Sequence, residues 1–210
     1  MSITTLFRKQ ASSEITDRLD AGALDQLFRK ARTHNVWRPI EVPDKLLEEA
    51  VELAKMGPTS ANASPLRIVF VRGPAAKLRL KPALMPGNVD KTMSAPVTAI
   101  MGHDTKFYEL LPRLFPHAEA KTWFVGNEAF ANDTAYKNGT LQVAYFIMAL
   151  RALGLDAGPM SGFDNAAVDA AFFPDGRIRS NVLINIGYGD LEKLFPRSPR
   201  LSFEEIATIV

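Results

Sequence analysis

The sequence predicts an α+β domain in which helices flank one central sheet. Three observations favour this class. Three short β-prone runs alternate with a larger number of helical segments. The 210 residues are 47% hydrophobic and 23% charged, as in a globular domain with a full-sized core. No repeat or linker divides the chain, so we expect a weakly structured lead-in over residues 1–20 and one domain over 21–210.

The N-terminal third predicts two helices followed by a strand. Apolar residues recur at helical spacing over 24–31, which indicates a first helix that ends near Arg32. Asp44 is a good N-cap for the second helix, which Gly57 and the following proline end. The dense β-prone run over 66–71 then suits a buried strand.

The middle of the chain predicts two further strands around an irregular segment. The strands are expected over 96–101 and 181–187. Between them, residues 103–132 interleave aromatics and prolines with charges and show no clean period. We therefore expect this segment to be an excursion from the core.

The longest helix is expected over 133–153, with Gly154 ending it. Its second half is apolar nearly all round, which predicts burial on several sides, often against a second subunit. Asp164 predicts the start of a short helix. Ser202 and Glu205 form a capping box for a last helix that reaches about Ile209.

Composition excludes several kinds of chemistry. The chain has no cysteine, which rules out disulfides, thiol nucleophiles, iron–sulfur clusters and thiolate zinc sites. His34, His103 and His117 lack a short ligand spacing, so we expect no metal site. The 25 basic and 23 acidic residues nearly balance, and the dispersed basic ones do not favour nucleic-acid binding. Without a secretory signal or a run long enough to span a bilayer, we expect a cytoplasmic protein that does not bind membranes.

The common catalytic motifs are missing. The sequence has no phosphate-binding P-loop and no GxSxG elbow. Gly187 and Gly189 begin like a dinucleotide fingerprint, but the third glycine is absent, and a strand-ending turn is the better interpretation. An enzyme with this sequence would therefore take its chemistry from a cofactor.

Four polar segments look suited to hold one, although each alone would be read as a solvated turn. They are residues 32–35, residues 58–65, residues 87–91, and residues 154–162 together with the late Arg197 and Arg200. Residues 58–62, Pro-Thr-Ser-Ala-Asn, resemble the Pro-Ser-Ser-x-Asn signature of the nitroreductase family of FMN-dependent oxidoreductases. Residues 154–162 resemble that family's Gly-Leu-x-x-x-Pro segment.

The resemblance extends from about Leu24 to the C-terminus. Within the family it is closest to the malonic semialdehyde reductase branch, through residues 31–35, 55–62, 81–84 and 111–118. It implies an interlocked homodimer with a mainly antiparallel sheet and FMN at the subunit interface. It also implies ping-pong hydride transfer from NADPH or NADH to a second substrate.

The resemblance assigns the cofactor site residue by residue. Arg32, Thr33 and Arg200 would meet the FMN phosphate, which suits the planar guanidinium fork of arginine. Asn35, Asn88 and Lys91 would lie along the pyrimidine edge of the ring, where a donor or cation stabilises the negative charge of the reduced flavin. The partner subunit would supply Thr59 and Ser60. Pro159 and Met160 would pack on one ring face, with a backbone N–H near Ser161 or Gly162 reaching flavin N5. His34, Pro58, Asn62 and Arg197 complete the cofactor-binding set.

No residue is assigned with certainty to the chemistry of the second substrate. Reduction of an aldehyde such as malonic semialdehyde to 3-hydroxypropionate, a step of pyrimidine degradation, needs a proton donor and a cation for the acid group. On the resemblance, His34, Arg113 and His117 are the candidates, and the aromatics of residues 103–132 would form a lid over the ring. A broad nitro- or quinone-reducing enzyme and a non-catalytic flavin-binding protein are the alternatives.

Overall fold

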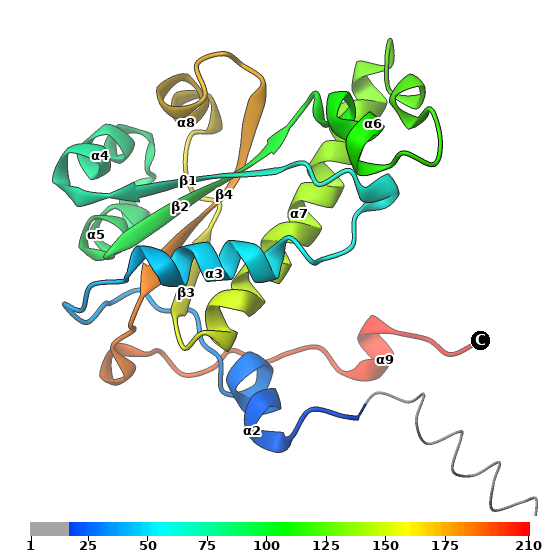
Figure 1. The fold of residues 1–210 in the computed structure, drawn as a ribbon. Coiled ribbons are helices and arrows are strands. Elements are labelled where there is room, and N and C mark those ends of the chain that lie inside the picture. Colours follow the sequence, from blue (N-terminus) through cyan, green and yellow to red (C-terminus); the bar gives the residue numbers. More distant parts are fainter. Residues whose placement is uncertain (1–16) are drawn as a thin grey trace, which may run out of the picture.

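The computed structural model describes residues 17–210 (Figure 1). Its four-stranded sheet consists of β1 (Leu66–Arg72), β2 (Val97–Asp104), β3 (Asp156–Met160) and β4 (Ile178–Gly187). The strand order is β1-β2-β4-β3, and each neighbouring pair is antiparallel. The α+β class and the antiparallel sheet expected from the sequence are therefore confirmed.

Two helical layers enclose the sheet (Figure 1). On one face, α3 (Asp44–Ala54) and α7 (Glu128–Ala152) pack on alternate strand residues such as Ala99 and Ile184. On the other face, α4 (Gly73–Leu80), α5 (Pro86–Ser94) and α8 (Asn165–Phe172) cover residues such as Ile100 and Leu183. The two-residue period of a strand thus divides its side chains between two apolar cores.

The excursion begins after β2 and ends sooner than expected, because α7 starts at Glu128, capped by the side chain of Asn127. It contains η4 (Phe107–Leu110), α6 (Leu111–Leu114) and η5 (Ala120–Trp123). Phe107, Leu111 and Phe124 form a third apolar cluster with the first turns of α7. The prediction of a start near 133 missed that cap.

Several element boundaries differ from the expectations. The first helix divides into α2 (Ala21–Leu24) and the π-helical η1 (Asp25–Arg29). Pro43, not Asp44, is the N-cap of α3. The helices α4 and α5 and the strand β3 were not expected, because their proline and glycine residues are typical of turns. The chain also forms η2 (Ser60–Asn62), η3 (Lys81–Ala83) and η6 (Leu191–Lys193).

The C-terminal tail, residues 190–210, leaves the sheet after β4 and runs past α2 (Figure 1). Its capping box is present, as expected, but α9 (Phe203–Ile206) ends before Ile209. Leu201, Phe203 and Ile206 are each more than half exposed. Most of the lead-in expected over residues 1–20 lies outside the described residues. Among residues 17–210, no helix combines the length and apolar character that crossing a bilayer requires.

Candidate functional site

Two of the polar segments, residues 32–35 and 154–162, lie side by side. Thr33 forms a parallel bridge with Ala157, and the backbone N–H of His34 donates to the Ala157 carbonyl at 3.4 Å. The half-buried Asn35 follows in the same segment. The first strand residues of β3 therefore hold residues 32–35 at the edge of the sheet.

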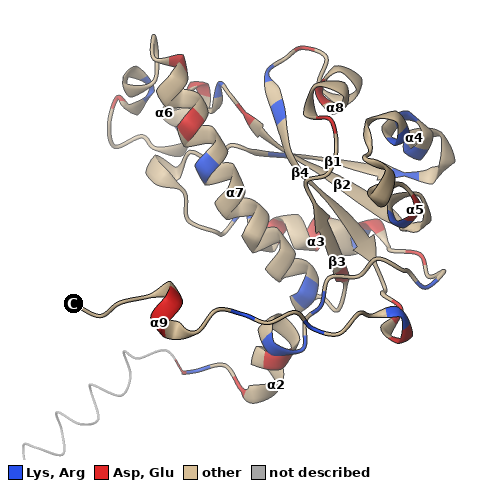
Figure 2. Ribbon diagram, turned by 180° about the vertical axis from the view of Figure 1, so that it is seen from behind, with Lys and Arg blue, Asp and Glu red and all other residues tan. Residues whose placement is uncertain are grey.

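Arg32, Arg151 and Arg197 lie near this edge, since the first two line one cavity and the third acts on the pKa of Arg151. Figure 2 shows basic residues in blue near α2 and at the C-terminal end of α7. Arg32 donates to the carbonyl of Phe195, while Arg197 Nη2 donates to the carbonyls of Arg29 at 2.9 Å and Ala31 at 2.8 Å. Arg151, in the last turn of α7, donates to the carbonyl of Leu27 at 3.0 Å. These bonds attach the tail and the first helix to α7.

The arginine cluster, defined as Arg32, Arg151 and Arg197, has an excess of positive charge. Within residues 17–210, no carboxylate lies within 4.0 Å of these guanidinium groups. Burial lowers the pKa of Arg151, and the neighbouring Arg197 lowers it further, while Asp156 acts in the opposite sense. A cavity of about 390 Å³ opens here, and both Arg32 and Arg151 line it. The cluster is therefore suited to bind an anion.

Arg151 was missed in the sequence, because a basic residue in the last turn of a helix is common there for the helix dipole alone. Arg200, which was expected at the phosphate, is exposed, and its bonds within residues 17–210 go to the carbonyls of Ser198 at 2.9 Å and Pro199 at 3.1 Å. Of the two arginines near the C-terminus, Arg197 contacts the segment before Arg32, whereas Arg200 does not.

The His34 ring is packed inside the protein. It is 2% exposed, and its Nε2 lies 3.4 Å from Asp156 Oδ1. Its Nδ1 has no hydrogen-bond partner among the described residues. The ring lies against Gly189, where an added Cβ would come within 1.9 Å of Nδ1. This packing favours a structural role for the ring, while the backbone of His34 stays at the candidate site.

The end of β3 meets α5. Asn88 Nδ2 donates to the Gly162 carbonyl at 2.7 Å, and the N–H of Met85 donates to the same carbonyl at 3.1 Å. A Cβ on Gly162 would lie 2.4 Å from Asn88 Nδ2, so a larger residue here would displace the Asn88 amide. Trp37 Nε1 donates to the Lys91 carbonyl at 3.1 Å. The structure thus brings residues 159–162, with Pro159, Met160 and Ser161, close to Asn88 and Lys91.

The loop over residues 58–64 has an unusual backbone. Ala61, Asn62 and Ser64 all have positive φ angles, of 49°, 49° and 42°. Such conformations are costly for residues other than glycine and concentrate at functional sites. The side chain of Thr59 accepts from the N–H of Ser64 at 3.1 Å, and Asn62 Nδ2 donates to the Leu114 carbonyl at 2.8 Å. The loop is therefore held in shape although it begins at Pro58 on the surface.

Two polar side chains on the inner face of α7 fix this loop and the start of β1, which follows it. Asn138 Oδ1 accepts from the N–H of Ser60 at 2.7 Å, and Gln142 Oε1 accepts from the N–H of Leu66 at 3.0 Å. Both are buried. The sequence analysis missed them, although a polar residue within an apolar helix is itself a signal, since buried amides need partners.

The predicted site residues form two groups in one chain. The loop contacts α7 at Asn138, whereas the arginine cluster contacts it at Arg151. The 1.5 Å rise of a helix places these positions roughly 20 Å apart. The exposed Arg113 and His117 lie in the excursion, which the bond to Leu114 connects with the loop. A single chain therefore does not unite the whole predicted set.

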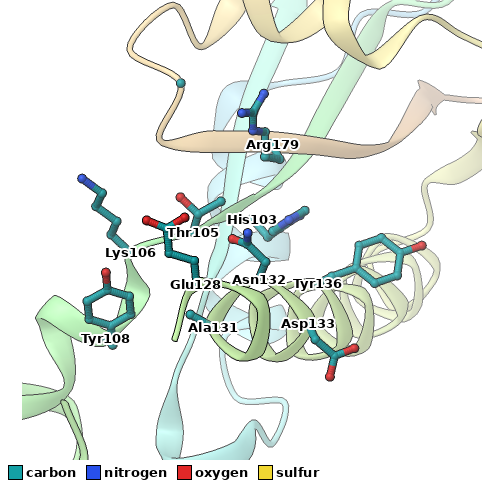
Figure 3. Close-up of a pocket in the computed structure, with 11 residues that line it drawn as sticks. His103, Thr105, Lys106, Tyr108, Glu128, Ala131, Asn132, Asp133, Tyr136 and Arg179 are labelled. Atoms are coloured by element: carbon teal, nitrogen blue, oxygen red, sulfur yellow. The ribbon is translucent and has the colours of Figure 1, made fainter. Parts of the chain in front are cut away.

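A cavity of about 540 Å³ lies between the first half of α7 and the ends of β2 and β4 (Figure 3). Its lining includes His103, which is buried, and also Lys106, Tyr136 and Arg179. None of the residues expected at the cofactor lines it. Burial lowers the pKa of His103, whose ring lies edge-on to Tyr136. This cavity is separate from the candidate cofactor site.

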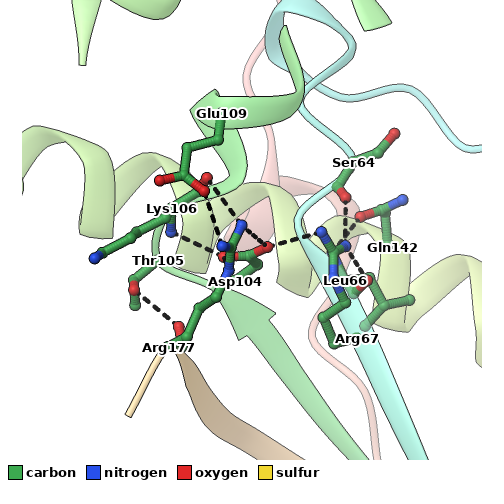
Figure 4. A network of polar contacts seen from close by, with 9 residues as sticks. All are labelled: Ser64, Leu66, Arg67, Asp104, Thr105, Lys106, Glu109, Gln142 and Arg177. Carbon is green, nitrogen blue, oxygen red and sulfur yellow. Dashed lines mark hydrogen bonds and ion pairs between the residues drawn. The ribbon is translucent and has the colours of Figure 1, made fainter. Parts of the chain in front are cut away.

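An ion-pair network anchors the start of the excursion (Figure 4). The buried Asp104 accepts from Arg67 Nη2 at 2.8 Å and from Arg177 Nε at 2.9 Å. Arg177 Nη1 also donates to Glu109 at 2.8 Å. The excursion is thus attached to both β1 and the segment before β4 by charge-assisted bonds.

Comparison with known proteins gives one consistent family. The model of the nitroreductase family matches residues 29–188. A relative from Burkholderia lata, provisionally named NADH dehydrogenase/NAD(P)H nitroreductase, is 63% identical over 191 residues. That alignment covers 91% of this chain and 98% of the relative.

Solved structures show the same fold. A protein from Bacillus subtilis described as a nitroreductase superposes with a TM-score of 0.80 at 22% identity, covering 91% of this chain and all of its own, 100%. Another, from Exiguobacterium sibiricum and solved in complex with FMN, has a TM-score of 0.79 at 18% identity. It covers 93% of this chain and 100% of its own.

Proposed function

Since the chain belongs to the nitroreductase family, we propose that it is an oxidoreductase that binds FMN and uses NAD(P)H as reductant. Bound FMN supplies the redox couple for hydride transfer between NAD(P)H and a second substrate. The chain's own residues then have to bind the cofactor, orient it and supply any proton that the second substrate needs.

The observation that carries this proposal is the arginine cluster. Arg32, Arg151 and Arg197 have no carboxylate partner among residues 17–210. Arg32 and Arg151 line a cavity, and Arg197 lies near enough to Arg151 to lower its pKa. A phosphate dianion is the group that such a set of guanidinium donors binds well, because each guanidinium can present two parallel N–H groups. The residues present therefore fit the FMN phosphate, and we propose Arg151 as a phosphate ligand in addition to those expected from the sequence.

The junction of β3 and α5 fits the ring. Lys91 provides a cation, and Asn35 and Asn88 provide amide donors, near residues 159–162. Such donors stabilise negative charge on the pyrimidine edge of a reduced flavin. The Gly162 carbonyl holds the Asn88 amide in place, so the donor is oriented before any ligand binds.

A homodimer would join the two halves of the site. With the loop and the arginine cluster roughly 20 Å apart in one chain, a second copy related by two-fold symmetry would supply Thr59 and Ser60 to the arginines of the first. The exposed Tyr136 and Leu141 on α7, and the exposed tail, support this assembly because apolar surface of this extent favours burial in an interface.

For the second substrate we propose malonic semialdehyde, reduced to 3-hydroxypropionate. Arg113 and His117 are exposed in the excursion, where a cation for the acid group and a proton donor for the forming alkoxide would be needed. The buried ring of His34 is less suited to this role. The likeness of residues 111–118 to the malonic semialdehyde reductase branch supports the choice.

A broad nitro- or quinone-reducing activity is the second candidate, and the name of the Burkholderia lata relative favours it. The deciding experiment reduces the FMN-loaded protein anaerobically with NADPH or NADH, then adds malonic semialdehyde or a nitroaromatic compound. Faster reoxidation by the aldehyde supports the specific assignment. Equally slow reoxidation by both would overturn it, and a protein that takes up no FMN would overturn every flavin-based proposal.

A further inference from the structure

A buried lysine lies behind the proposed ring site. Lys77, on α4, is 4% exposed. Its ammonium donates to the Thr92 carbonyl at 2.7 Å and to Thr98 Oγ1 at 2.5 Å. No carboxylate in the described part of the chain pairs with it. An unpaired buried charge costs several kcal/mol, so the fold gains little stability from it.

The ammonium starts a directed chain of hydrogen bonds. Thr98 accepts from Lys77 and donates to Asn185 Oδ1 at 2.7 Å. The Asn185 amide then donates to Thr92 Oγ1 at 3.3 Å and to the Lys91 carbonyl at 3.3 Å. An ammonium can only donate, so its presence sets the direction of the hydroxyl and the amide that follow.

The chain of hydrogen bonds ends at residues that the sequence analysis assigned to the cofactor site. Thr92 Oγ1 points to Met160 Sδ at 3.6 Å, and the Lys91 carbonyl also accepts from Trp37. Because Asn185 pairs with Gly158 in the sheet, these hydrogen bonds link α4, α5 and β3 through the interior of the protein. A substitution of Lys77 would therefore alter how Lys91 and Met160 are held, although Lys77 itself does not contact the cofactor site.

We propose that Lys77 is a positioning residue of the FMN site, whose charge orders the Thr98–Asn185–Thr92 chain and thereby fixes Lys91 and Met160. This inference rests on the proposed function. Polar chains of this kind polarise one another in the interior, so removing the charged end weakens each later bond.

The residues of the hydrogen-bond chain that starts at Lys77 carry no charge. Thr98 on β2, Asn185 on β4 and Thr92 on α5 are neutral. The partly buried Lys91 of α5 precedes Thr92, and the buried titratable His103 lies further along β2 from Thr98. Asp169 of α8 accepts from the Ser180 N–H, and Arg67 and Arg72 of β1 pair with Asp104 and Asp44. Asp90, Arg79 and Lys81 are exposed. Burial alone lowers the pKa of Lys77 to about 8.

The test compares Lys77→Met with Lys81→Met, which removes an exposed lysine next to the same helix. FMN dissociation constants are measured by fluorescence titration of the apoprotein. We expect Lys77→Met to bind FMN about tenfold more weakly, with a shifted visible spectrum of the bound flavin, and Lys81→Met to match the wild type. Thermal unfolding of each apoprotein checks that the fold is kept.

A pH series provides the second measurement. In the wild type, FMN affinity should fall between about pH 7 and pH 9.5 as the ammonium loses its charge, and Lys77→Met should lack this step. Thr98→Val, which keeps the lysine but breaks the chain, should weaken binding in the same direction. A folded Lys77→Met that binds FMN like the wild type, or a wild type without the step, overturns this inference alone. A wild type that binds no FMN overturns the proposed function, and this inference with it.

Discussion

At the scale of single residues, His34 occupies a space that exists only because residue 189 is glycine. The ring is buried, and the backbone of His34 belongs to the segment that pairs with β3. A side chain at residue 189 would compete directly with the ring, because its Cβ would lie 1.9 Å from Nδ1. The packing of one histidine thus determines where the residues beside the arginine cluster lie.

Replacing Gly189 with alanine should therefore destabilise the protein by about 2 kcal/mol or more, since the buried ring has nowhere to move. Chemical denaturation measures the free energy of unfolding. Gly87→Ala is the matched control, because nothing lies within 4 Å of its added Cβ and its φ is not positive. Equal stability of the two variants would contradict the packing argument.

Lys77 gives the stability of the apoprotein a pH dependence. Its pKa is about 8 in the fold and 10.5 without burial, so between these values the unfolded chain binds more protons. Stability should therefore rise with pH across this window, by at most about 3 kcal/mol from this group. Denaturant titrations at fixed protein concentration measure it. Lys77→Met should remove that rise, and a rise of the same size in the variant would count against the assignment.

At the scale of elements, the inner face of α7 organises the site. Asn138 and Gln142 interrupt an otherwise apolar face and hold the loop that carries three strained residues. The long helix also presents Arg151 at its other end. One element therefore sets the positions of both halves of the candidate site.

Asn138→Ala would leave the N–H of Ser60 without its acceptor and let the strained loop relax. We expect about tenfold weaker FMN binding, in line with the loss of one buried hydrogen bond. The control is Lys137→Ala, which removes only an exposed pair with Asp133 that contributes little to stability. Fluorescence titration compares the two, and the prediction fails if both variants bind FMN equally well.

Much of the element pattern was predictable, and the exceptions have physical reasons. The strands β1 and β4 are dense in β-branched and aliphatic residues, so their existence follows from the sequence. By contrast, β3 contains Gly158 and Pro159, and its place at the edge of the sheet is what tolerates the proline. The helices α4 and α5 begin at Gly73 and Pro86, which are typical of turns.

At the scale of the whole molecule, the candidate site is divided. Motif resemblance named residues 32–35, 58–62 and 154–162. The structure places the first and third segments together, but the second lies against the middle of α7, at Asn138. Distances across a fold are not contained in local spacing, so Arg151, Asn138 and Gln142 could not be assigned from it. Their roles depend on which helix face turns inward.

The exposed tail provides a test of assembly. Phe203 and Ile206 are 59% and 70% exposed in the single chain. We expect the proposed dimer to bury them. Replacing both with aspartate should convert the dimer into a monomer in sedimentation velocity, because buried unpaired carboxylates are costly. Lys193→Ala, also in the tail, should remain dimeric. A wild type that sediments as a monomer would contradict the two-fold assembly itself.

The separation of the two half-sites along α7 also has a genetic consequence. In the two-fold dimer proposed above, each site would take Arg32 from one subunit and Ser60 from the other. Subunits with Arg32→Glu should therefore complement subunits with Ser60→Pro. In their mixed dimer one site would carry both substitutions, and the other site would carry neither. Two alleles that are inactive alone should restore about a quarter of the wild-type activity when co-expressed and paired at random.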